Sequence, residues 1–495
     1  MDDDFYLTRN PLLGDPARLW KIWFAPGCLL DYYPIEASIQ AAQWHLWHLN
    51  TLGYHLSNLC LHLISALLVW RLLGKFGLRH AWLGGFLFAI HPVVVESVAW
   101  MSEFKNTLSL PPFLLAMCAW IDFEERSLRR DYLMALGLFL VAMLCKVSMA
   151  PFPIVILLYA WWKRGRIAWN DLRNASPFLF ISVVLGSTTI LAGIWFRQAL
   201  LQSAENPQIG DFAAHLALAG QSIGFYFSKC VFPVDLIPIY PKWRIDPRSI
   251  LSYLPWLGLV AAGIWFWIRR ATWGRHALLG CGFFLLNLAP FIGFTSASYM
   301  RFTWVMDHFL YIPLIGLIGL AVAGLDQEEG RISAPMRRAM AVGTAVVLVV
   351  LAWESHNYAE VFSGPEKLWT YTLERNPDSY LPYNNLGVVM LEMRRIPKAI
   401  DIYQIALRLN PGMVEAHNNL GLAYFMNGQI QEAIEQYEEA LKYDPHSALV
   451  HANFGNALSF EGRREEAIGH YWQALRTDPH NADALTNLAK LKPEH

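Results

Sequence analysis

The sequence predicts an all-α protein in which a polytopic transmembrane helical bundle is followed by a solenoid of helical repeats. Two observations carry this prediction. The chain of 495 residues is 55% hydrophobic and only 16% charged, whereas soluble domains carry roughly 25% charged residues. After residue 360 the long apolar runs end and a 34-residue period begins. The net charge of −1 gives no overall basic field that would favour nucleic acid as a partner.

The first 52 residues open with three adjacent carboxylates, Asp2, Asp3 and Asp4. An acidic run at a terminus is usually a solvated tail. The alternative is that these carboxylates form part of a site in the first outer loop, 1–52. The other charged residues of the chain decide between these two interpretations.

Residues 53–359 alternate apolar segments with short charged loops, and a helix needs about 20 apolar residues to cross a bilayer. The candidate spans are 53–72, 81–101, 106–121, 131–149, 150–162, 176–197, 251–268, 276–294, 304–325 and 338–354. Prolines in or beside the two short spans, 106–121 and 150–162, predict broken or tilted helices there.

Basic residues gather in alternate loops, beginning with Arg71, Lys75 and Arg79. By the positive-inside rule these loops are cytoplasmic, so the N-terminus, the segment 198–250 and everything after 354 lie on the outer side. Residues 212–232 are apolar enough to span the bilayer, but a span there would break the charge alternation. We therefore expect a helix that lies at the outer interface.

Beyond residue 360, small residues, an aromatic residue and a proline recur every 34 residues. The recurring positions are Pro377, Pro411, Pro445 and Pro479; Gly387, Gly421 and Gly455; Ala399, Ala433 and Ala467; Tyr403, Tyr437 and Tyr471; and Ala406, Ala440 and Ala474. This pattern matches the tetratricopeptide repeat, except that the usual tryptophan position holds Tyr383, His417 and His451. The sequence predicts a repeat domain over 360–495, with a helix near 363–376, full repeats 380–413, 414–447 and 448–481, and a capping helix from 482.

Asparagines recur in the same register, at Asn385, Asn419, Asn453 and Asn487. An amide both donates to and accepts from a peptide backbone, so a ladder of amides could bind an extended acceptor polypeptide whatever its sequence. Concave repeat surfaces mostly bind peptides or proteins. The alternative is that asparagine is simply common at this repeat position.

Ionisable residues inside apolar spans are functional candidates, because burying a charge in a bilayer costs on the order of 2.5–3.5 kcal/mol. The candidates are His91, Glu96, Lys146, Asp307 and His308, with Lys105 and Arg301 just beyond in outer loops. The topology places all except His91 near the side where Asp2 to Asp4 lie. Each has a structural alternative: snorkelling for Lys146, a helix kink for His91, a structural pair for Asp307 and His308, and interfacial anchoring for Lys105 and Arg301.

These residues lie in segments that resemble a known family. The segments are "DDDFYLTRNPLL", "HLSNLCLHLISALLVWRLL", "HPVVVESVAWMSEFKNTLS", "LVAMLCKVSM", "FYFSKCVFPVDLIPIYP" and "MDHFLYIPLIGL". Their order resembles that of bacterial membrane proteins with C-terminal tetratricopeptide repeats, and these are similar to the eukaryotic transmembrane-and-tetratricopeptide O-mannosyltransferases. The resemblance covers nearly the whole chain. It implies a GT-C-like transmembrane fold in the bacterial cytoplasmic (inner) membrane, with the N-terminus and repeats on the periplasmic side.

The family takes a sugar from a polyprenyl-phosphate carrier, and an acidic residue of the first outer loop is its catalytic carboxylate. Carried over, this role falls on Asp3, then Asp4 and Asp2. Relatives usually have a transmembrane helix before this motif, so we expect Met1 to be an internal residue of a longer chain. They also commonly have Asp-Arg-Tyr where this chain has Asp307, His308 and Phe309; His308 would bind phosphate only when protonated.

Glycosyl transfer needs a base for the acceptor hydroxyl and cations for the departing phosphate. The cationic candidates are Lys105, Lys146, Arg301 and His308, and the supporting residues are His91, Glu96 and Asp307. With one base and no second nucleophile, direct inverting displacement is the simpler mechanism. Neighbouring aspartates could instead hold Mg²⁺ or Mn²⁺; the sequence leaves the metal open.

The predicted function is transfer of a sugar from a polyprenyl-phosphate-linked donor to a protein Ser/Thr hydroxyl outside the membrane, with the repeats binding the acceptor and membrane lipids surrounding the bundle. The first alternative is a non-catalytic membrane scaffold whose repeats recruit partners for envelope or polysaccharide assembly. A polysaccharide polymerase or ligase is the second. Buried Lys146 and Asp307 favour an enzyme over a scaffold, which has no need of buried charge.

Overall fold

The computed structural model describes residues 19–25, 31–200, 209–294, 297–329 and 332–491, which fall into two compact units, 1–360 and 361–495. The described residues form α-helices and short 3-10 helices and include no β-strand. This confirms the predicted all-α class. Asp2, Asp3 and Asp4 lie outside the described residues.

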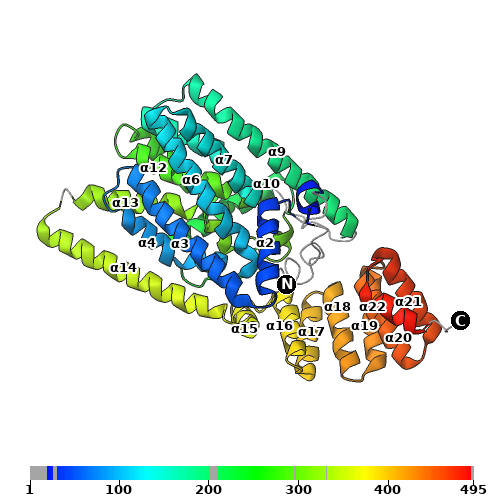
Figure 1. The fold of residues 1–495 in the computed structure, drawn as a ribbon. Coiled ribbons are helices and arrows are strands. Elements are labelled where there is room, and N and C mark those ends of the chain that lie inside the picture. The colour runs from blue at the N-terminus through cyan, green and yellow to red at the C-terminus, as the bar shows by residue number, and fades with distance from the viewer. Residues whose placement is uncertain (1–18, 26–30, 201–208, 295–296, 330–331, 492–495) are drawn as a thin grey trace. The chain divides into compact units, whose positions relative to one another are not determined.

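The first unit holds the helices up to α14 (Figure 1). These are α1 (Lys21–Phe24), α2 (Pro34–Trp47), α3 (Thr51–Lys75), α4 (Ala81–Ile90), α5 (Val95–Ala99), α6 (Phe104–Arg126), α7 (Arg129–Cys145), α8 (Phe152–Arg164), α9 (Trp169–Leu200), α10 (Phe212–Val231), α11 (Leu254–Ile268), α12 (Gly274–Leu288), α13 (Leu314–Glu329) and α14 (Ala334–Val361). Short 3-10 helices connect them: η4 (Pro92–Val94), η5 (Met101–Glu103), η6 (Val147–Met149), η7 (Ile250–Tyr253), η8 (Ala289–Phe291), η9 (Ser298–Arg301) and η10 (Asp307–Leu310).

Among the described residues, 4 helices are long and apolar enough to cross a membrane, and a bent pair of helices makes a fifth candidate if it counts as one span. The helices are α3, α9, α11 with η7, and α14, and the bent pair is α4 with η4 and α5. Every other predicted span also contains a helix. α7, α8, α12 and α13 have only 17, 13, 15 and 16 residues, fewer than the roughly 20 that cross a bilayer upright. Their crossing stays a prediction.

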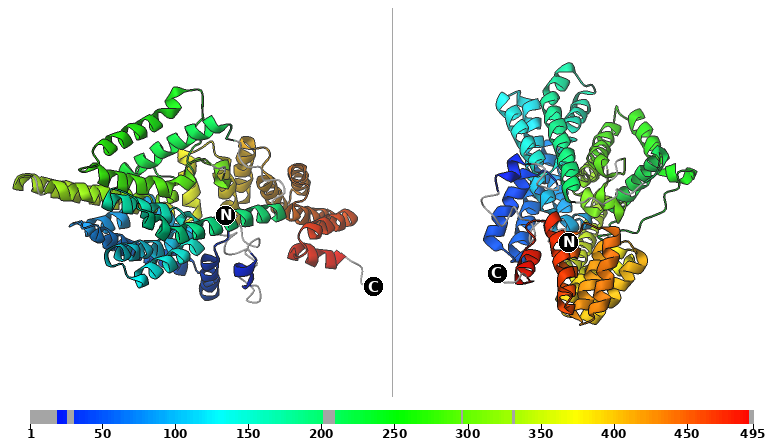
Figure 2. Two further views of the ribbon diagram at one scale, coloured as in Figure 1. Left: turned by 90° about the horizontal axis from the view of Figure 1, so that it is seen from above. Right: turned by 90° about the vertical axis from the view of Figure 1, so that its right-hand side faces the viewer.

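The longest helices line the outside of the first unit. α9 and α14 run along its edges (Figure 1), and further views show the same bundle from two sides (Figure 2). In α14 no residue of the most apolar window is buried. Inside, α3 packs against α4 and α6, and α6 packs against α7. Aromatic rings fill this interior; for example, the Phe152 ring stacks against both Phe139 and Phe178, at 4.8 Å and 5.4 Å. The bundle therefore has a packed core and an apolar exterior.

The prolines do not break the helices of the two short spans, and a tilt of these helices stays a prediction. α6 runs without interruption through Pro111 and Pro112. Pro151 and Pro153 do not break α8; they stand at its N-terminus, where a missing N–H costs nothing.

The bend between α4 and α5 has an angle of 57° and is held by side chains from distant helices. α4 ends at Ile90, so its last carbonyls need donors from outside the helix. His62 Nε2 bonds the Ala89 carbonyl at 3.1 Å, and Ser355 Oγ donates to the Ile90 carbonyl at 2.6 Å. His91 Nε2 bonds the Cys230 carbonyl at 3.0 Å. His91 thus has the contacts of a satisfied histidine at a kink.

The second unit consists of helix pairs that follow the predicted repeats. Its helices are α15 (Pro365–Arg375), α16 (Tyr380–Glu392), α17 (Ile396–Leu409), α18 (Val414–Met426), α19 (Ile430–Tyr443), α20 (Ala448–Glu461), α21 (Arg464–Thr477) and α22 (Ala482–Leu491). The pairs α16–α17, α18–α19 and α20–α21 lie within 380–413, 414–447 and 448–481.

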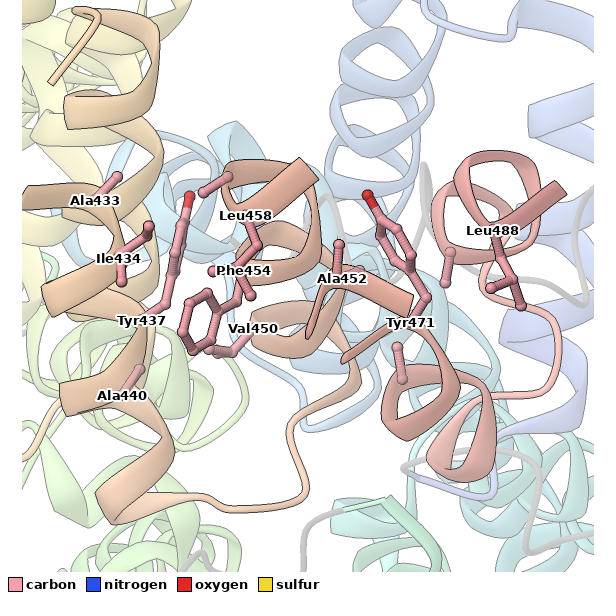
Figure 3. Packing of buried hydrophobic residues seen from close by; sticks show 14 residues of the cluster. Ala433, Ile434, Tyr437, Ala440, Val450, Ala452, Phe454, Leu458, Tyr471 and Leu488 are labelled. Atoms are coloured by element: carbon pink, nitrogen blue, oxygen red, sulfur yellow. The ribbon is translucent and has the colours of Figure 1, made fainter. Parts of the chain in front are cut away.

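The recurring glycine and tyrosine form one contact within each repeat. A Cβ on Gly421 would come within 2.6 Å of the Tyr437 ring, and one on Gly455 within 2.7 Å of Tyr471. Both tyrosines are fully buried between helices, and Tyr437 faces Phe454 at a ring separation of 6.0 Å (Figure 3). The 34-residue spacing of glycine and tyrosine therefore reflects one close helix contact repeated along the solenoid.

Candidate functional site

Ionisable side chains, most of them buried, meet where α2, α5, η5, α6, α7 and η10 come together. They are Glu36, Glu96, Glu103, Lys105, Lys146 and His308, and with the amide of Asn106 they are here called the Glu103 cluster. α6 begins at this cluster and α7 ends at it, so it lies at the end of the bundle opposite the basic loop that holds Arg126 and Arg129. Buried charges persist only when they are paired or hydrogen-bonded, and each charged member of this cluster has an oppositely charged neighbour.

Glu103 stands at the centre, in the 3-10 turn before α6, and is 4% exposed. Its Oε2 accepts from Asn106 Nδ2 at 2.5 Å, and its Oε1 lies 3.7 Å from Lys105 Nζ. Burial alone would raise the pKa of Glu103, but His308, Lys105 and Lys146 together hold it at about 2. Glu103 is therefore an anion at neutral pH.

Lys146 enters the cluster from the end of α7, where the chain turns from an α-helix into η6. It is 5% exposed, and its Nζ donates to Asn106 Oδ1. The amide of Asn106 thus accepts from the lysine and donates to Glu103, so it links the cation to the anion. A snorkelling lysine would reach water or headgroups, whereas this one ends inside the protein.

His308 lies between two carboxylates. Its Nδ1 is 2.8 Å from Glu96 Oε1, and its Nε2 is 3.9 Å from Glu103 Oε1. Glu96 is fully buried, and its Oε2 has no hydrogen-bond partner among the described residues. His308 therefore hydrogen-bonds the Glu96 carboxylate and lies beside that of Glu103.

Glu36 projects from the first turn of α2 and is 5% exposed. Burial raises its pKa to about 8, with Lys105 opposing this shift. The side chain is therefore a neutral acid at neutral pH, and it can donate a hydrogen bond where Glu103 can only accept one.

Glu36 is expected to make stability depend on pH. In the folded protein it keeps its proton up to about pH 8, against an ordinary pKa of 4.5. The folded state then binds more protons than the unfolded chain, so the contribution of Glu36 to stability is complete below pH 4.5 and is lost as the pH rises through 8. Glu36→Gln is expected to remove this loss. Thermal midpoints of the purified protein should diverge in favour of the variant between pH 5 and 8.

Exposed Glu374 provides the control, because Glu374→Gln should leave the pH profile of the midpoint unchanged. Parallel profiles for wild type and Glu36→Gln would contradict the assignment of a buried neutral acid at this position.

The other predicted site residues of the first unit lie elsewhere. Asp307 is fully buried, and its carboxylate accepts from Tyr240 at 2.9 Å and 3.0 Å and from Tyr358 at 3.5 Å. Arg301 is exposed in η9, and His91 bonds a backbone carbonyl. The structure therefore brings Lys105, Lys146, His308 and Glu96 together and places Asp307, Arg301 and His91 in other surroundings.

The sequence interpretation missed Glu36, Glu103 and Asn106. One signal was available for Glu36, since it is the only acidic residue between Asp31 and Glu96. Glu103 and Lys105 are the only charged residues between Glu96 and Asp122. Nothing in the spacing predicted that an asparagine would connect a lysine 40 residues away to this carboxylate.

The predicted metal ligands, Asp2 to Asp4, lie outside the described residues. Within the described residues, no group of three or more His, Cys, Asp or Glu side chains is placed to hold a metal ion. The divalent cation stays a prediction.

In the second unit the asparagines form a hydrogen-bonded ladder across the repeats. Asn419 Nδ2 donates to Asn384 Oδ1 at 3.1 Å, and Asn453 Nδ2 donates to Asn418 Oδ1 at 2.8 Å. Asn487 Nδ2 donates to Asn456 Oδ1 at 2.8 Å, while Nδ2 of Asn385 has no partner among the described residues. The amides thus connect neighbouring repeats, and peptide binding by them stays a prediction.

Two family descriptions match the chain. Residues 34–195 match the dolichyl-phosphate-mannose-protein mannosyltransferase family, and residues 414–447 match the tetratricopeptide repeat. The first match begins in the first turn of α2 and includes every member of the Glu103 cluster except His308.

Two curated proteins are similar to the chain in sequence. The chain is 23% identical to the protein O-mannosyl-transferase Tmtc3 of Drosophila melanogaster over 455 residues, which cover 77% of this chain and 48% of that protein. It is 31% identical to an uncharacterized membrane protein of Schizosaccharomyces pombe over 123 residues, which cover 23% and 24%. The chain therefore spans about half the length of the first relative and a quarter of the second.

Solved structures match in part. The Arabidopsis OM64 TPR domain is 21% identical with a TM-score of 0.23, covering 23% of this chain and 93% of that one. MamA from Desulfovibrio magneticus RS-1 is 18% identical with a TM-score of 0.25, covering 26% and 75%. Together, the family matches and Tmtc3 confirm the resemblance to the transmembrane-and-tetratricopeptide O-mannosyltransferases.

Proposed function

We propose that this chain, a multi-pass membrane protein that combines a mannosyltransferase-family region with tetratricopeptide repeats, transfers a sugar from a polyprenyl-phosphate-linked donor to a Ser/Thr hydroxyl of a protein. The observation that carries the proposal is the Glu103 cluster. It gathers Lys146, Lys105 and the imidazole of His308 at one end of the bundle, and all of its members except His308 lie in the region that matches the mannosyltransferase family.

The cations of the cluster suit the leaving group of this reaction. When the bond between the anomeric carbon and the phosphate oxygen breaks, negative charge grows on that oxygen. Lys146, Lys105 and protonated His308 would stabilise it in a site with little water. Glu103 and Asn106 hold these groups in position, although the carboxylate offsets part of their charge. Asn106 orients the lysine before the donor arrives, so little reorganisation is needed during the reaction.

The base that accepts the proton of the acceptor hydroxyl is assigned to Asp3, then to Asp4 and Asp2. The hydroxyl oxygen attacks the anomeric carbon, its proton passes to the aspartate, and the polyprenyl phosphate leaves with the electrons of the broken bond. One displacement inverts the configuration at the anomeric carbon. Glu36, being neutral, would donate to the sugar or the phosphate rather than act as this base.

The repeats are assigned to the acceptor polypeptide, on the outer side of a bacterial inner membrane. Asn385, Asn419, Asn453 and Asn487 run along the first helices of successive repeats and the capping helix. Each primary amide has two donor hydrogens and two acceptor lone pairs. A ladder that uses one of them between repeats therefore keeps others for a peptide backbone.

Sugar transfer in isolated membranes tests the proposal. Asp3→Asn and Asp4→Asn are expected to lower transfer from a polyprenyl-phosphate donor by on the order of 10²–10⁴-fold at equal protein level, because the amide accepts no proton. Asp378→Asn, an exposed aspartate of the repeat unit, is the matched control and should transfer at the wild-type rate.

Undiminished transfer by both aspartate variants would refute the assignment of the base but not of the reaction. Absence of transfer by the wild type to every acceptor tested would refute the reaction itself and favour the scaffold.

A further inference from the structure

A cavity of about 720 Å³ lies between α3, α8, α12 and α13. Its walls are apolar and include Leu72, Leu73, Val155, Tyr159, Phe283 and Ile315. The cavity is partly open and is much larger than the voids that packed protein interiors leave, so it has room for an occupant. Because the walls are apolar, water is a poor one.

The polar residues of the lining lie at one end of the cavity. They are Arg79, Thr272, His276, Asp326 and Gln327, at the end of the bundle where α3 and α13 finish and α12 begins. The lining on α13 runs from Ile315 to Gln327, a rise of about 18 Å at 1.5 Å per residue. One leaflet of hydrocarbon is about 15 Å thick, half of a core of roughly 30 Å. The cavity therefore has the depth and the polarity of a single lipid leaflet.

Hydrogen bonds fix the polar end. Asp326 accepts from the backbone N–H of Arg79 at 2.6 Å and of His80 at 3.3 Å, which ties the turn after α3 to α13. On the other side, Trp162 Nε1 donates to His276 Nδ1 at 3.1 Å. Arg79 itself is exposed, so its guanidinium is available to an anionic group at this rim.

This end of the bundle is not the end of the Glu103 cluster. α6 begins at the cluster and ends at Arg126, and α8 runs in the same direction, from η6 beside Lys146 to Arg164. The cavity is lined by the second half of α8, from Val155 to Trp162. A donor with its phosphate at Lys146 would thus lie in the opposite leaflet.

We propose that the cavity binds one acyl chain of a phospholipid from the leaflet on the side of the basic loops, with the phosphate of its headgroup at Arg79. The depth, the apolar walls and the polar rim each match this ligand, and the basic loops favour an anionic headgroup. The lipid would fill the space between α3, α8, α12 and α13 as a structural component of the bundle.

Glycines of α13 offer a test, because they line the cavity without a side chain that would narrow it. A Cβ on Gly324, which lines the cavity, would meet no atom within 4 Å, so a bulky side chain fits there and obstructs the lipid. Gly137 on α7 also has open space at its Cβ, is exposed and is absent from this lining. Gly324→Trp and Gly137→Trp are therefore a matched pair.

The full chain is reconstituted in nanodiscs with phosphatidylglycerol that carries a photoreactive group in its acyl chain, and cross-linked peptides are mapped by mass spectrometry. We expect labelling of α12 and α13 at the cavity lining, labelling reduced to background in Gly324→Trp, and wild-type labelling in Gly137→Trp. Arg79→Gln should weaken labelling by phosphatidylglycerol more than by phosphatidylcholine.

Two outcomes overturn the proposal. In one, wild-type peptides of the cavity carry no label, a result that needs no variant. In the other, unlabelled polyprenyl phosphate prevents labelling where an equal amount of phosphatidylglycerol does not, which would assign the cavity to the carrier chain instead.

Discussion

Lys146→Met is expected to lower the rate of sugar transfer by on the order of 10²–10³-fold, which is the effect of removing one preorganised group that stabilises transition-state charge. Methionine keeps most of the volume and the apolar stem of lysine, so the packing at the end of α7 should survive. The charge that faces the leaving phosphate is lost, and Asn106 Oδ1 loses its donor. Initial rates in membranes at matched protein level measure the effect.

The kinetic pattern identifies the role of the lysine. A lower kcat with little change in KM indicates an interaction made mainly in the transition state, whereas a higher KM alone indicates donor binding. Lys163, exposed at the far end of α8, provides the control substitution Lys163→Met. If Lys146→Met transferred sugar at the wild-type rate, the Glu103 cluster would have no role in the reaction.

Glu103→Gln is expected to destabilise the folded protein by about 3–5 kcal/mol, since removing one partner of a buried ion pair leaves the other charge uncompensated. Three groups depend on this carboxylate: Lys105, His308 and, through Asn106, Lys146. The thermal midpoint of the purified protein should fall clearly. Glu366→Gln removes the exposed pair with Arg395, at 3.0 Å, and should cost at most about 1 kcal/mol.

A double variant separates lost charge from lost packing. Glu103→Gln combined with Lys146→Met removes an anion and a cation together, so the sum of the single effects should exceed the effect of the pair. If the two effects simply add, the carboxylate and the lysine are not energetically coupled, and Asn106 does not transmit the interaction.

The repeats were predictable because one contact is repeated. A glycine and a tyrosine, such as Gly421 and Tyr437, recur at equivalent positions every 34 residues. Because the two side-chain positions are in contact, the two helices that carry them lie at the same distance from each other in every repeat. The bundle was predictable only in outline. Apolar length indicates where helices lie, but it does not distinguish a helix that ends at Leu288 from a span that continues to residue 294.

The site was harder to predict, since its contacts join distant parts of the chain. The cost of a charge in an apolar segment marks Lys146 and His308 as candidates, and both belong to the cluster. Asp307 and His308 are neighbours in sequence, yet the 3-10 turn η10 directs one to tyrosines and the other to Glu96. Sequence spacing gives no information on which way consecutive side chains of such a turn will point.

The hydrogen bonds that hold the α4–α5 bend imply an order of events during synthesis. The hydrogen-bond donor to the Ile90 carbonyl, Ser355, lies 265 residues further along the chain. The partner of Glu96, His308, lies 212 residues further along. Chains are made from the N-terminus, so the ribosome must add more than 200 further residues before either group is satisfied. Until then, the nascent segment around Pro92 depends on the translocation machinery or on water for these bonds, and its final angle is set only when α14 emerges.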